Sequence, residues 1–330
     1  MNNTDTAIQE GLISVLMCTY NTNQIFLKEA IDSVLNQTYS NFEFIFVDDG
    51  SANQSFEFIQ TYTDPRIKLL QNQKNMGLTY SLNEGLDLCR GEYIARMDAD
   101  DICFPDRFEK QFAYMRTHPD TIVCGTWAEY IDENDRLTGK KVCWKINDME
   151  AYRIHLLFAN RPTIFHSSSM INRRIMLEHN IRYNTEYRYA QDFRMWVSCS
   201  EYGICTNYPE ILLKFRVHPN SIGQSRFEER LIYDYGIIQE QLDRLHLVLP
   251  DELKPVHFRL LTEYKRKPYS KELAKWLNTI IQANKKYKVY NQRKLNYMLR
   301  TCLIKIFFRS MARPVLGPVK RKLRAIIRKK

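Results

Sequence analysis

The stretch "GEYIARMDADD", residues 91–101, reads as a buried strand that ends in negative charge. Its apolar run is followed by three carboxylates, Asp98, Asp100 and Asp101, within four consecutive positions. Like charges this close repel one another, and removing them from water near a core costs free energy unless a positive group compensates. We therefore expect a site for a positively charged partner where this strand ends.

The segments that precede this stretch alternate between strand and helix patterns. Short apolar runs predict buried strands at 12–21, 42–51 and 67–72, and apolar residues at helical spacing predict helices at 24–37 and 79–88. This alternation is typical of an α/β doubly wound sheet, in which ligands bind outside the carboxyl ends of the strands. Three strand ends should therefore face one crevice, namely Thr19-Tyr20-Asn21, Asp48-Asp49-Gly50-Ser51 and Asp98-Ala99-Asp100-Asp101.

The second half of the chain has a less regular pattern. Residues 121–131 and 210–223 look like strands, residues 166–180 like a strand leading into a helix, and residues 190–203 like a helix. From about residue 228 onward the pattern is helical and charged. We expect a second half-domain followed by a helical extension.

The acidic cluster has two readings. Asp100 or Asp101 could cap a helix that begins near Pro105, but a cap explains one aspartate and not three. A hard divalent cation, Mg²⁺ or Mn²⁺, held by carboxylates and completed by substrate phosphates, explains the cluster better. The chain has no GxxxxGK[ST] loop, and no GxGxxG follows its first strand, which argues against a P-loop nucleotidase and a dinucleotide-binding domain. A nucleoside diphosphate attached to a transferable group remains.

Five ordered motifs carry a family resemblance. They are "ISVLMCTYN", "FEFIFVDDGS", "NMGLTYSLNEGL", "GEYIARMDADD" and "YAQDFRMW". In this order and spacing they resemble the family 2 glycosyltransferases, over roughly residues 12 to 223. The resemblance implies the GT-A fold with its Rossmann-like α/β sheet, a nucleotide-sugar donor (usually a UDP-sugar), a divalent metal and inversion at the anomeric carbon.

The resemblance also implies roles for residues of the donor site. Thr19, Tyr20 and Asn21 would line the nucleotide pocket. Asp49 would accept a hydrogen bond from the uracil ring, with Asn75 and Gly77 beside the base. Asp98 would lie near the ribose or the donor sugar as the first carboxylate of a DXD motif, and Arg96 would contact the donor.

The same comparison suggests the metal ligands and the catalytic base. Asp100 would bind the metal together with Asp98, and "FRVHPNSIG" (215–223) would bring Arg216 to the diphosphate and His218 to the metal. Asp192 would be the general base that deprotonates the acceptor hydroxyl. The family usually has an acidic residue directly before this aspartate, where this chain has Gln191. A structural role for His218, and a helix-capping role for Asp192, remain the alternatives.

Charge divides the chain into an acidic body and a basic tail. All 38 acidic residues lie at or before Glu272, whereas 17 of the 48 basic residues follow it, so the first 272 residues carry a formal charge of −7. Apolar residues recur at helical spacing in 295–311 among basic ones, and "VKRKLRAIIRKK" (319–330) repeats the pattern. We expect a basic amphipathic segment on an anionic membrane surface. A helix docked on the protein, or a nucleic-acid contact, are the alternatives.

The compartment follows from cysteine use and hydropathy. Eight cysteines are scattered without a CxxC pair, which fits a reducing compartment, and no run reaches the roughly 18 apolar residues of a membrane span. The first residues also lack the basic-then-apolar order of a signal peptide. We expect a cytoplasmic protein, peripheral on the cytoplasmic face of the cell membrane.

Together these patterns predict two regions. Residues 1–227 would form the catalytic domain, with nucleotide-sugar binding in about 12–105 and the acceptor half in about 106–227, and residues 228–330 a helical, basic extension. The predicted function is an inverting, metal-dependent hexosyltransferase that moves a sugar to a hydroxyl of a glycan or lipid-linked acceptor in capsule, O-antigen or lipooligosaccharide synthesis. No nucleic-acid partner is expected.

Two other functions remain as alternatives. A nucleotidyltransferase that makes nucleotide-sugars would normally show a Gly-rich, basic loop after its first strand, and "CTYNTNQ" (18–24) has neither feature. A catalytically silent glycan- or nucleic-acid-binding module would have no need for the acidic cluster and Asp192.

Overall fold

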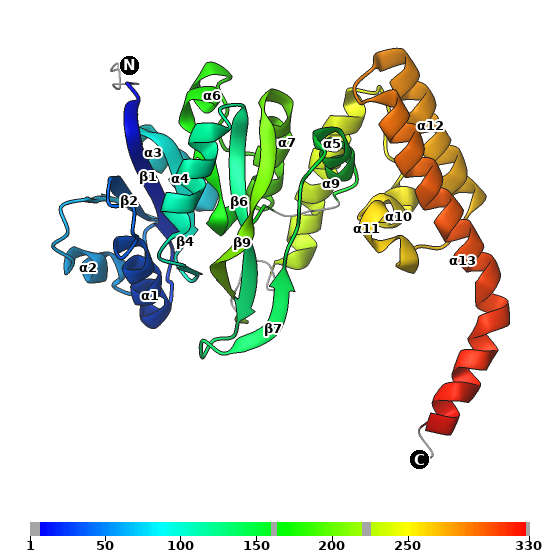
Figure 1. The fold of residues 1–330 in the computed structure, drawn as a ribbon, viewed down its shortest axis with the longest axis horizontal. Coiled ribbons are helices and arrows are strands. Elements are labelled where there is room, and N and C mark those ends of the chain that lie inside the picture. Colours follow the sequence, from blue (N-terminus) through cyan, green and yellow to red (C-terminus); the bar gives the residue numbers. More distant parts are fainter. Residues whose placement is uncertain (1–6, 160–163, 220–225, 328–330) are drawn as a thin grey trace. The chain divides into compact units, whose positions relative to one another are not determined.

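The computed structural model describes residues 7–159, 164–219 and 226–327. The chain forms two compact units. The first consists of Met1–Met149 and Pro162–Tyr233, and the second of Glu150–Arg161 and Asp234–Lys330. Figure 1 shows the chain coloured along its sequence.

The first unit is built on a nine-stranded sheet within the described residues, with β3-β2-β1-β4-β8-β6-β9-β5 as its strand order and β7 paired to β6. One half is parallel and contains β1 (Gln9–Thr19), β2 (Phe42–Asp48), β3 (Ile67–Gln71) and β4 (Gly91–Asp98). The mixed half contains β5 (Ile102–Cys103), β6 (Thr121–Ile131), β7 (Leu137–Val142), β8 (Met170–Asn172) and β9 (Ile204–Arg216). The predicted α/β sheet is confirmed, with a mixed second half.

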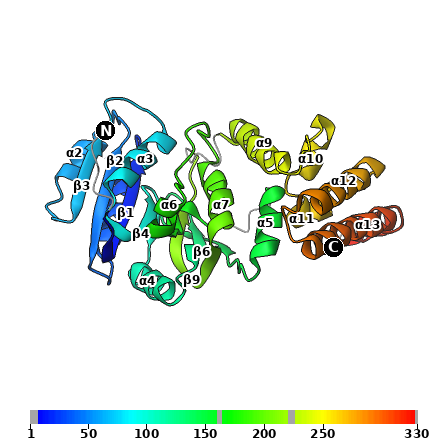
Figure 2. The ribbon, with the colours of Figure 1, turned by 90° about the horizontal axis from the view of Figure 1, so that it is seen from above.

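Helices lie on both faces of this sheet. They are α1 (Gln24–Leu35), α2 (Ser55–Gln60), α3 (Leu78–Leu88), α4 (Arg107–Thr117), α6 (Arg173–Glu178) and α7 (Gln191–Tyr202), with a 3₁₀ turn η1 at His166–Ser168. Figure 2 shows α4 on one face and α6 and α7 on the other. With both faces covered, the central strands read as continuous apolar runs, and every residue of β2 is buried.

The register of the parallel strands brings their carboxyl ends together. Thr19 at the end of β1 lies opposite Asp48 of β2, and Cys18 lies opposite Asp98 of β4. The polar residues that follow β1, β2 and β4 therefore come out at one edge of the sheet, as the sequence predicts.

The second unit is helical. It contains α5 (Met149–Leu157) from Glu150 onward, the later part of α9 (Phe227–Asp243), and then η2 (Asp251–Leu253), α10 (Lys254–His257), α11 (Leu260–Glu263), η3 (Tyr264–Arg266), α12 (Lys271–Tyr287) and α13 (Gln292–Ile327). His257 joins three of them: its Nδ1 accepts from Trp276 Nε1 at 3.1 Å, and its Nε2 donates to the Leu157 carbonyl at 2.9 Å. Burial lowers the pKa of His257 to about 4, so the imidazole is neutral.

Several predicted boundaries differ from the structure. The first unit ends at Tyr233 rather than at residue 227, and residues 150–161, expected in the acceptor half, belong to the helical unit. The strand expected at 210–223 begins earlier, at Ile204. Local apolar periodicity does not show which unit a short helix such as α5 joins, because that depends on contacts with residues about a hundred positions away.

None of the described helices combines the length and the apolar content that crossing a bilayer requires.

Candidate functional site

A cavity of about 720 Å³ lies at the carboxyl ends of β1, β2 and β4 in the first unit. Nine of the twelve predicted site residues line it: Thr19, Tyr20, Asn21, Asp49, Asn75, Gly77, Asp98, Asp100 and His218. The other three, Arg96, Arg216 and Asp192, are not among the described residues of its lining. The structure thus brings together residues spread over some 200 positions of the sequence, while their individual roles stay predictions.

Asp49 fixes one wall of this cavity. Its Oδ1 accepts from Asn72 Nδ2 and from the Met76 N–H, and its Oδ2 from the Gly77 N–H, each at 2.8 Å. Among the described residues Oδ2 has this single donor, which leaves one of its lone pairs for an incoming N–H group. The predicted hydrogen bond from a nucleobase is therefore compatible with the loop that Asp49 holds in place.

Gly50, next to Asp49, lets the backbone at Lys74 and Asn75 pass close to the end of β2. Its φ of +71° lies in the left-handed region, and a Cβ there would come within 2.5 Å of the Lys74 carbonyl carbon. The close approach of two backbone segments requires a glycine at this position. The sequence analysis placed Gly50 at a strand end but gave it no role of its own, although a glycine that follows two aspartates is a recognisable turn signal.

Asn21 connects the end of β1 with the segment after β2. Its N–H donates to Ser51 Oγ at 2.9 Å, and its Oδ1 accepts from the Ala52 N–H at 2.8 Å. Its φ of +51° is in the left-handed region, which asparagine tolerates better than most residues. Tyr20 beside it is exposed. This segment presents an aromatic ring and polar backbone to the cavity.

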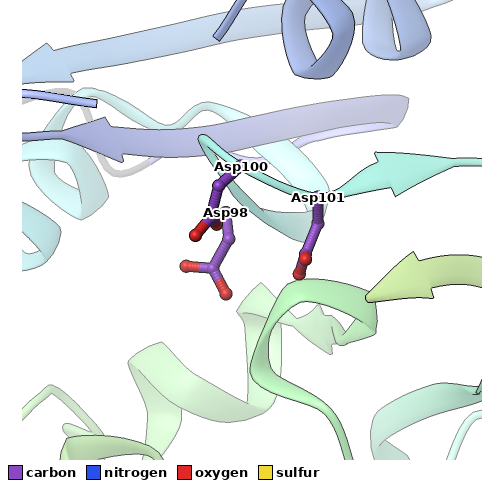
Figure 3. Close-up of side chains that lie close together, drawn as sticks. All are labelled: Asp98, Asp100 and Asp101. Atoms are coloured by element: carbon purple, nitrogen blue, oxygen red, sulfur yellow. The ribbon is translucent and has the colours of Figure 1, made fainter. Parts of the chain in front are cut away.

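The three aspartates of the acidic cluster differ in their surroundings. Their carboxylate oxygens lie within 4.8 Å of one another, and Figure 3 shows Asp98 and Asp100 next to each other with Asp101 standing apart. Asp98 forms an ion pair with the buried Arg96, and its N–H donates to Ser167 Oγ at 3.0 Å. Burial raises the pKa of Asp98; the Arg96 charge opposes this rise, and the charges of Asp100 and Asp192 add to it.

Asp101 faces the protein interior. It is 1% exposed, and its Oδ1 accepts from the backbone N–H of Arg216 at 2.8 Å. Burial, together with the charges of Asp100 and Asp98, holds the pKa of Asp101 well above its usual range. Asp101 therefore positions the chain rather than facing the cavity, as expected for a residue that supports the turn.

Arg216 holds the acidic loop from behind. Its Nε donates to the Asp100 carbonyl at 2.8 Å, and the fully buried guanidinium pairs with Glu29 at 2.6 Å and with Asp135. Its guanidinium also lies 4.3 Å from the centre of the Phe26 ring. These contacts give Arg216 a structural role in fixing Asp100 and Asp101. Its predicted contact with a diphosphate stays a prediction.

Asp98 and Asp100 offer carboxylate oxygens that suit a hard divalent cation, and His218 lies beside Asp100. His218 Nε2 lies 2.9 Å from Asp100 Oδ2, and all three residues line the cavity. Mn²⁺ binds both carboxylates and imidazoles. Mg²⁺ prefers oxygen ligands, so the two carboxylates suit it better than the imidazole does. A cation would also relieve the repulsion between Asp98 and Asp100. The residues present therefore fit the predicted ion.

Asp192 lies in the first turn of α7, after Ala190 with its φ of +61°. Its charge acts on the acidic cluster, since it contributes to the raised pKa of Asp98, and it also raises that of Tyr183. Its Oδ1 accepts from the Phe193 N–H at 2.8 Å. A carboxylate in the first turn of a helix is favoured by the helix dipole, which fits the position of Asp192 in α7.

Five residues near the site escaped the sequence analysis. Glu133, Arg188, Tyr189 and Arg226 line the cavity, and the two arginines bring positive charge to it. Behind β4, the fully buried Arg107 donates to the carbonyls of Arg96 at 2.9 Å and of Ser167 at 2.8 Å. Tyr189 opens the motif "YAQDFRMW" but was given no role, and none of the four charged residues stands in a pattern that distinguishes it from a solvated surface charge.

A second cavity, of about 800 Å³, lies where β4, β6 and β9 begin. Two ion pairs lie in its lining, Arg174 with Glu10 at 2.7 Å and Arg116 with Glu92 at 3.7 Å. The acidic cluster is at the other ends of these strands, so we place the functional site there.

Comparison with known sequences identifies the family of this chain. Residues 14–179 match the model of "Glycosyl transferase family 2". An uncharacterised glycosyltransferase of Methanocaldococcus jannaschii is 35% identical over 69% of this chain and 78% of its own length. One from Haemophilus influenzae is 37% identical over 63% of this chain and 66% of its own length, just under two thirds. The amylovoran biosynthesis glycosyltransferase AmsE of Erwinia amylovora is 30% identical over 72% and 86%.

Solved structures show the same fold. Staphylococcus aureus TarS (residues 1–349), in complex with UDP-GlcNAc, has a TM-score of 0.58 at 16% identity and covers 91% of this chain and 90% of its own. The mannosyltransferase PcManGT of Pyrobaculum calidifontis, in complex with GDP-Man and Mn²⁺, has a TM-score of 0.53 at 15% identity and covers 89% and 86%. The fold is therefore that of the GT-A glycosyltransferases. The chain belongs to glycosyltransferase family 2.

Proposed function

We propose that this glycosyltransferase moves a sugar, with inversion at the anomeric carbon, from a nucleotide-sugar to a hydroxyl of a glycan or lipid-linked acceptor. The observation that carries the proposal is the convergence of Asp49, Asp98 and Asp100 on one cavity, with the charge of Asp192 acting on the same cluster. A UDP-sugar is the proposed donor. The UDP-GlcNAc in TarS and the GDP-Man in PcManGT support a nucleotide-sugar of this kind.

In the proposed transfer, different residues of the site bind the base, face the diphosphate and take the proton of the acceptor. Asp49 and the Asn75–Gly77 wall bind the base, and Asp98 with Asp100 face the diphosphate side. Asp192 takes the proton of the acceptor hydroxyl while that oxygen attacks C1, and the C1–O bond breaks with its electron pair leaving on the nucleoside diphosphate. Attack opposite the leaving group inverts the configuration.

The metal part of the proposal rests on Asp98, Asp100 and His218. When bound there, Mn²⁺ or Mg²⁺ supplies positive charge against the departing diphosphate. The protein holds these ligands ready through Arg216 and Asp101, which fix the loop, and through Arg96, which pairs with Asp98.

The biological setting is also a proposal. The relationship to an amylovoran biosynthesis enzyme supports a role in surface polysaccharide synthesis, in a cytoplasmic enzyme held at the membrane that carries a lipid-linked acceptor. The basic end of the chain would provide that attachment. The predicted basic segment 319–330 lies outside the residues whose side chains are described.

The test is release of UDP or GDP from a panel of nucleotide-sugars, with and without Mn²⁺, followed by mass spectrometry of the product. We expect turnover with one donor class and its loss on metal removal. Activity without added metal in a chelator would contradict the metal proposal. Pyrophosphate release from a nucleoside triphosphate and a sugar phosphate would instead indicate the nucleotidyltransferase alternative. Neither turnover nor nucleotide binding with any donor would contradict the enzyme proposal.

A further inference from the structure

Helix α13 has two apolar faces, and only one of them is packed. Leu295, Leu299, Cys302 and Ile306 recur at steps of four and three residues, are at most 5% exposed, and contact the helical unit, where Cys302 Sγ donates to the Leu260 carbonyl. The sequence analysis expected this face to meet the membrane. That expectation was wrong for these four residues, because they form part of the core of the helical unit.

The opposite face of α13 exposes large apolar side chains. Tyr297 is 69% exposed, Ile304 54%, Phe308 65% and Met311 61%. Their steps of seven, four and three residues place them in one stripe. Ile304 and the buried Ile306 are two residues apart, which separates their side chains by about 200° around the helix axis. An exposed apolar row of this length marks an interaction surface more often than a scatter of single residues does.

Basic side chains flank this stripe. Arg293, Arg300, Lys305 and Arg309 are all exposed along the same part of α13. Lys305 lies 5.5 Å from the centre of the Tyr264 ring, which directs it to one side of the stripe. The sequence after Glu272 contains no acidic residue, so nothing on this part of the chain offsets the positive charge. The partner of this face must accept both apolar side chains and cations.

We propose that the exposed face of α13, formed by Tyr297, Ile304, Phe308 and Met311, lies in the surface layer of an anionic lipid bilayer. In that position the apolar side chains reach the acyl boundary, the tyrosine ring stays at the level of the headgroups, and the flanking cations meet lipid phosphates. The buried face of the same helix keeps it attached to the helical unit.

The charge pattern favours this partner over two others. A nucleic acid would attract the cations but leaves four large apolar side chains in the middle of the contact without a role. A second copy of the chain would bring a face of the same positive charge against this one, which costs free energy. A lipid surface accommodates both features.

This inference rests on the proposed membrane-held acceptor for its purpose, but the binding itself needs no turnover. The full chain is mixed with vesicles of phosphatidylglycerol and phosphatidylcholine, and separately with pure phosphatidylcholine, and the bound fraction is measured by sedimentation. We expect binding to the anionic vesicles that weakens with salt. The double variant Ile304→Ser/Phe308→Ser should lower the partition coefficient at least about tenfold, since each side chain loses its apolar transfer energy.

Two further variants separate the contributions. Arg300→Glu/Arg309→Glu should reduce binding to anionic vesicles by at least about tenfold, because each cation near the surface contributes to it. Val248→Ser, which removes an even more exposed apolar side chain from the helical unit outside α13, should leave binding unchanged. Because all of these side chains are exposed, unchanged melting curves are expected and would confirm that the variants fold.

Four outcomes would overturn the proposal. The first two are that the unaltered chain does not bind vesicles, or that the α13 variants bind them equally well. The other two are that the chain self-associates in a way that Ile304→Ser/Phe308→Ser abolishes, or that it binds duplex DNA or RNA more tightly than vesicles. Nucleotide-sugar turnover measured with a soluble acceptor is independent of all four. If the chain binds vesicles but has no transferase activity, this inference stands and the proposed function is contradicted. If the chain has transferase activity but does not bind vesicles, the proposed function stands and this inference is contradicted.

Discussion

His218 Nε2 lies 2.9 Å from Asp100 Oδ2, although the two residues are 118 positions apart in the sequence. This contact joins the end of β9 to the acidic loop after β4, and it carries the first prediction. His218→Ala should raise the Mn²⁺ concentration for half-maximal activity about 10- to 100-fold, the usual effect of removing a residue from a metal's surroundings. A metal titration of nucleotide release measures it. A lower kcat with an unchanged metal requirement would show that His218 acts only on the loop.

Asp100 and Asp101 are neighbours, but the same substitution should lower activity to very different extents at the two positions. Asp100→Asn should cost at least about a hundredfold in kcat/KM, because a cation ligand and a negative charge at the cavity are lost together. Asp101→Asn should cost less than about tenfold, because an amide oxygen can still accept from the Arg216 N–H. Steady-state kinetics of the two variants measures this difference. Equal losses would show that Asp101 also contributes to the donor site.

Asp192→Asn should remove the proposed base without changing the donor pocket. We expect kcat to fall about 10²- to 10⁴-fold, the contribution of a positioned general base, with little change in UDP affinity by calorimetry. Gln191→Ala, in the same turn of α7, is the matched control and should be nearly silent. A parallel loss of UDP affinity in Asp192→Asn would place the base elsewhere.

Gly50→Ala tests the close approach behind Asp49. The new methyl group would lie 2.5 Å from the Lys74 carbonyl carbon at a left-handed φ, so the Asn75–Gly77 wall must move and UDP affinity should fall at least about tenfold. Gly139→Ala is the control, because its φ of +76° carries the same backbone strain with no atom within 4 Å. Isothermal titration with UDP compares them. Equal affinities would mean that the loop adjusts without affecting the pocket.

His257 makes the helical unit sensitive to acid. Its pKa is lowered from 6.5 to about 4 by burial, so between these values the unfolded chain binds a proton that the folded chain does not. Stability is therefore complete above about pH 6.5 and falls as the pH approaches 4, by on the order of 3 kcal/mol. Denaturant unfolding at several pH values measures this slope. His257→Gln should flatten it, and a slope unchanged in that variant would assign the effect to other groups.

The sequence predicted the parallel half of the sheet well because its signals are local. β2 is apolar at five of its seven positions and is followed by a second aspartate and a glycine, so its type, its end and its place at the cavity are all visible in ten residues. β8 was also expected, as a strand that leads into a helix within 166–180, but the structure limits it to the three residues Met170–Asn172 before α6. Its place between β4 and β6 depends on pairing partners far away in the chain.

The candidate site shows the same limit. Asp49, Asp98 and Asp100 stand where strands end, so pattern and family resemblance find them. Arg216 was also found, but its buried contacts with Glu29 and Asp135 could not be, because no spacing relates a helix near residue 29 to a turn near residue 135. Similarly, the composition of α13 shows that it is amphipathic but not which apolar face is covered, since that depends on what α11, α12 and η3 present to it.

The bond from the Arg216 N–H to Asp101 has a consequence for the order in which this protein takes shape. The aspartate and its donor are 115 residues apart, so during synthesis the loop after β4 emerges long before the strand end that fixes it. Asp49 and the wall at Asn75–Gly77 need only residues up to 77 for their hydrogen bonds. The nascent chain can therefore form the wall at Asn75–Gly77 early, whereas the acidic loop acquires its final geometry only when β9 joins the sheet. The proposed donor site is then complete only when the first unit is nearly complete.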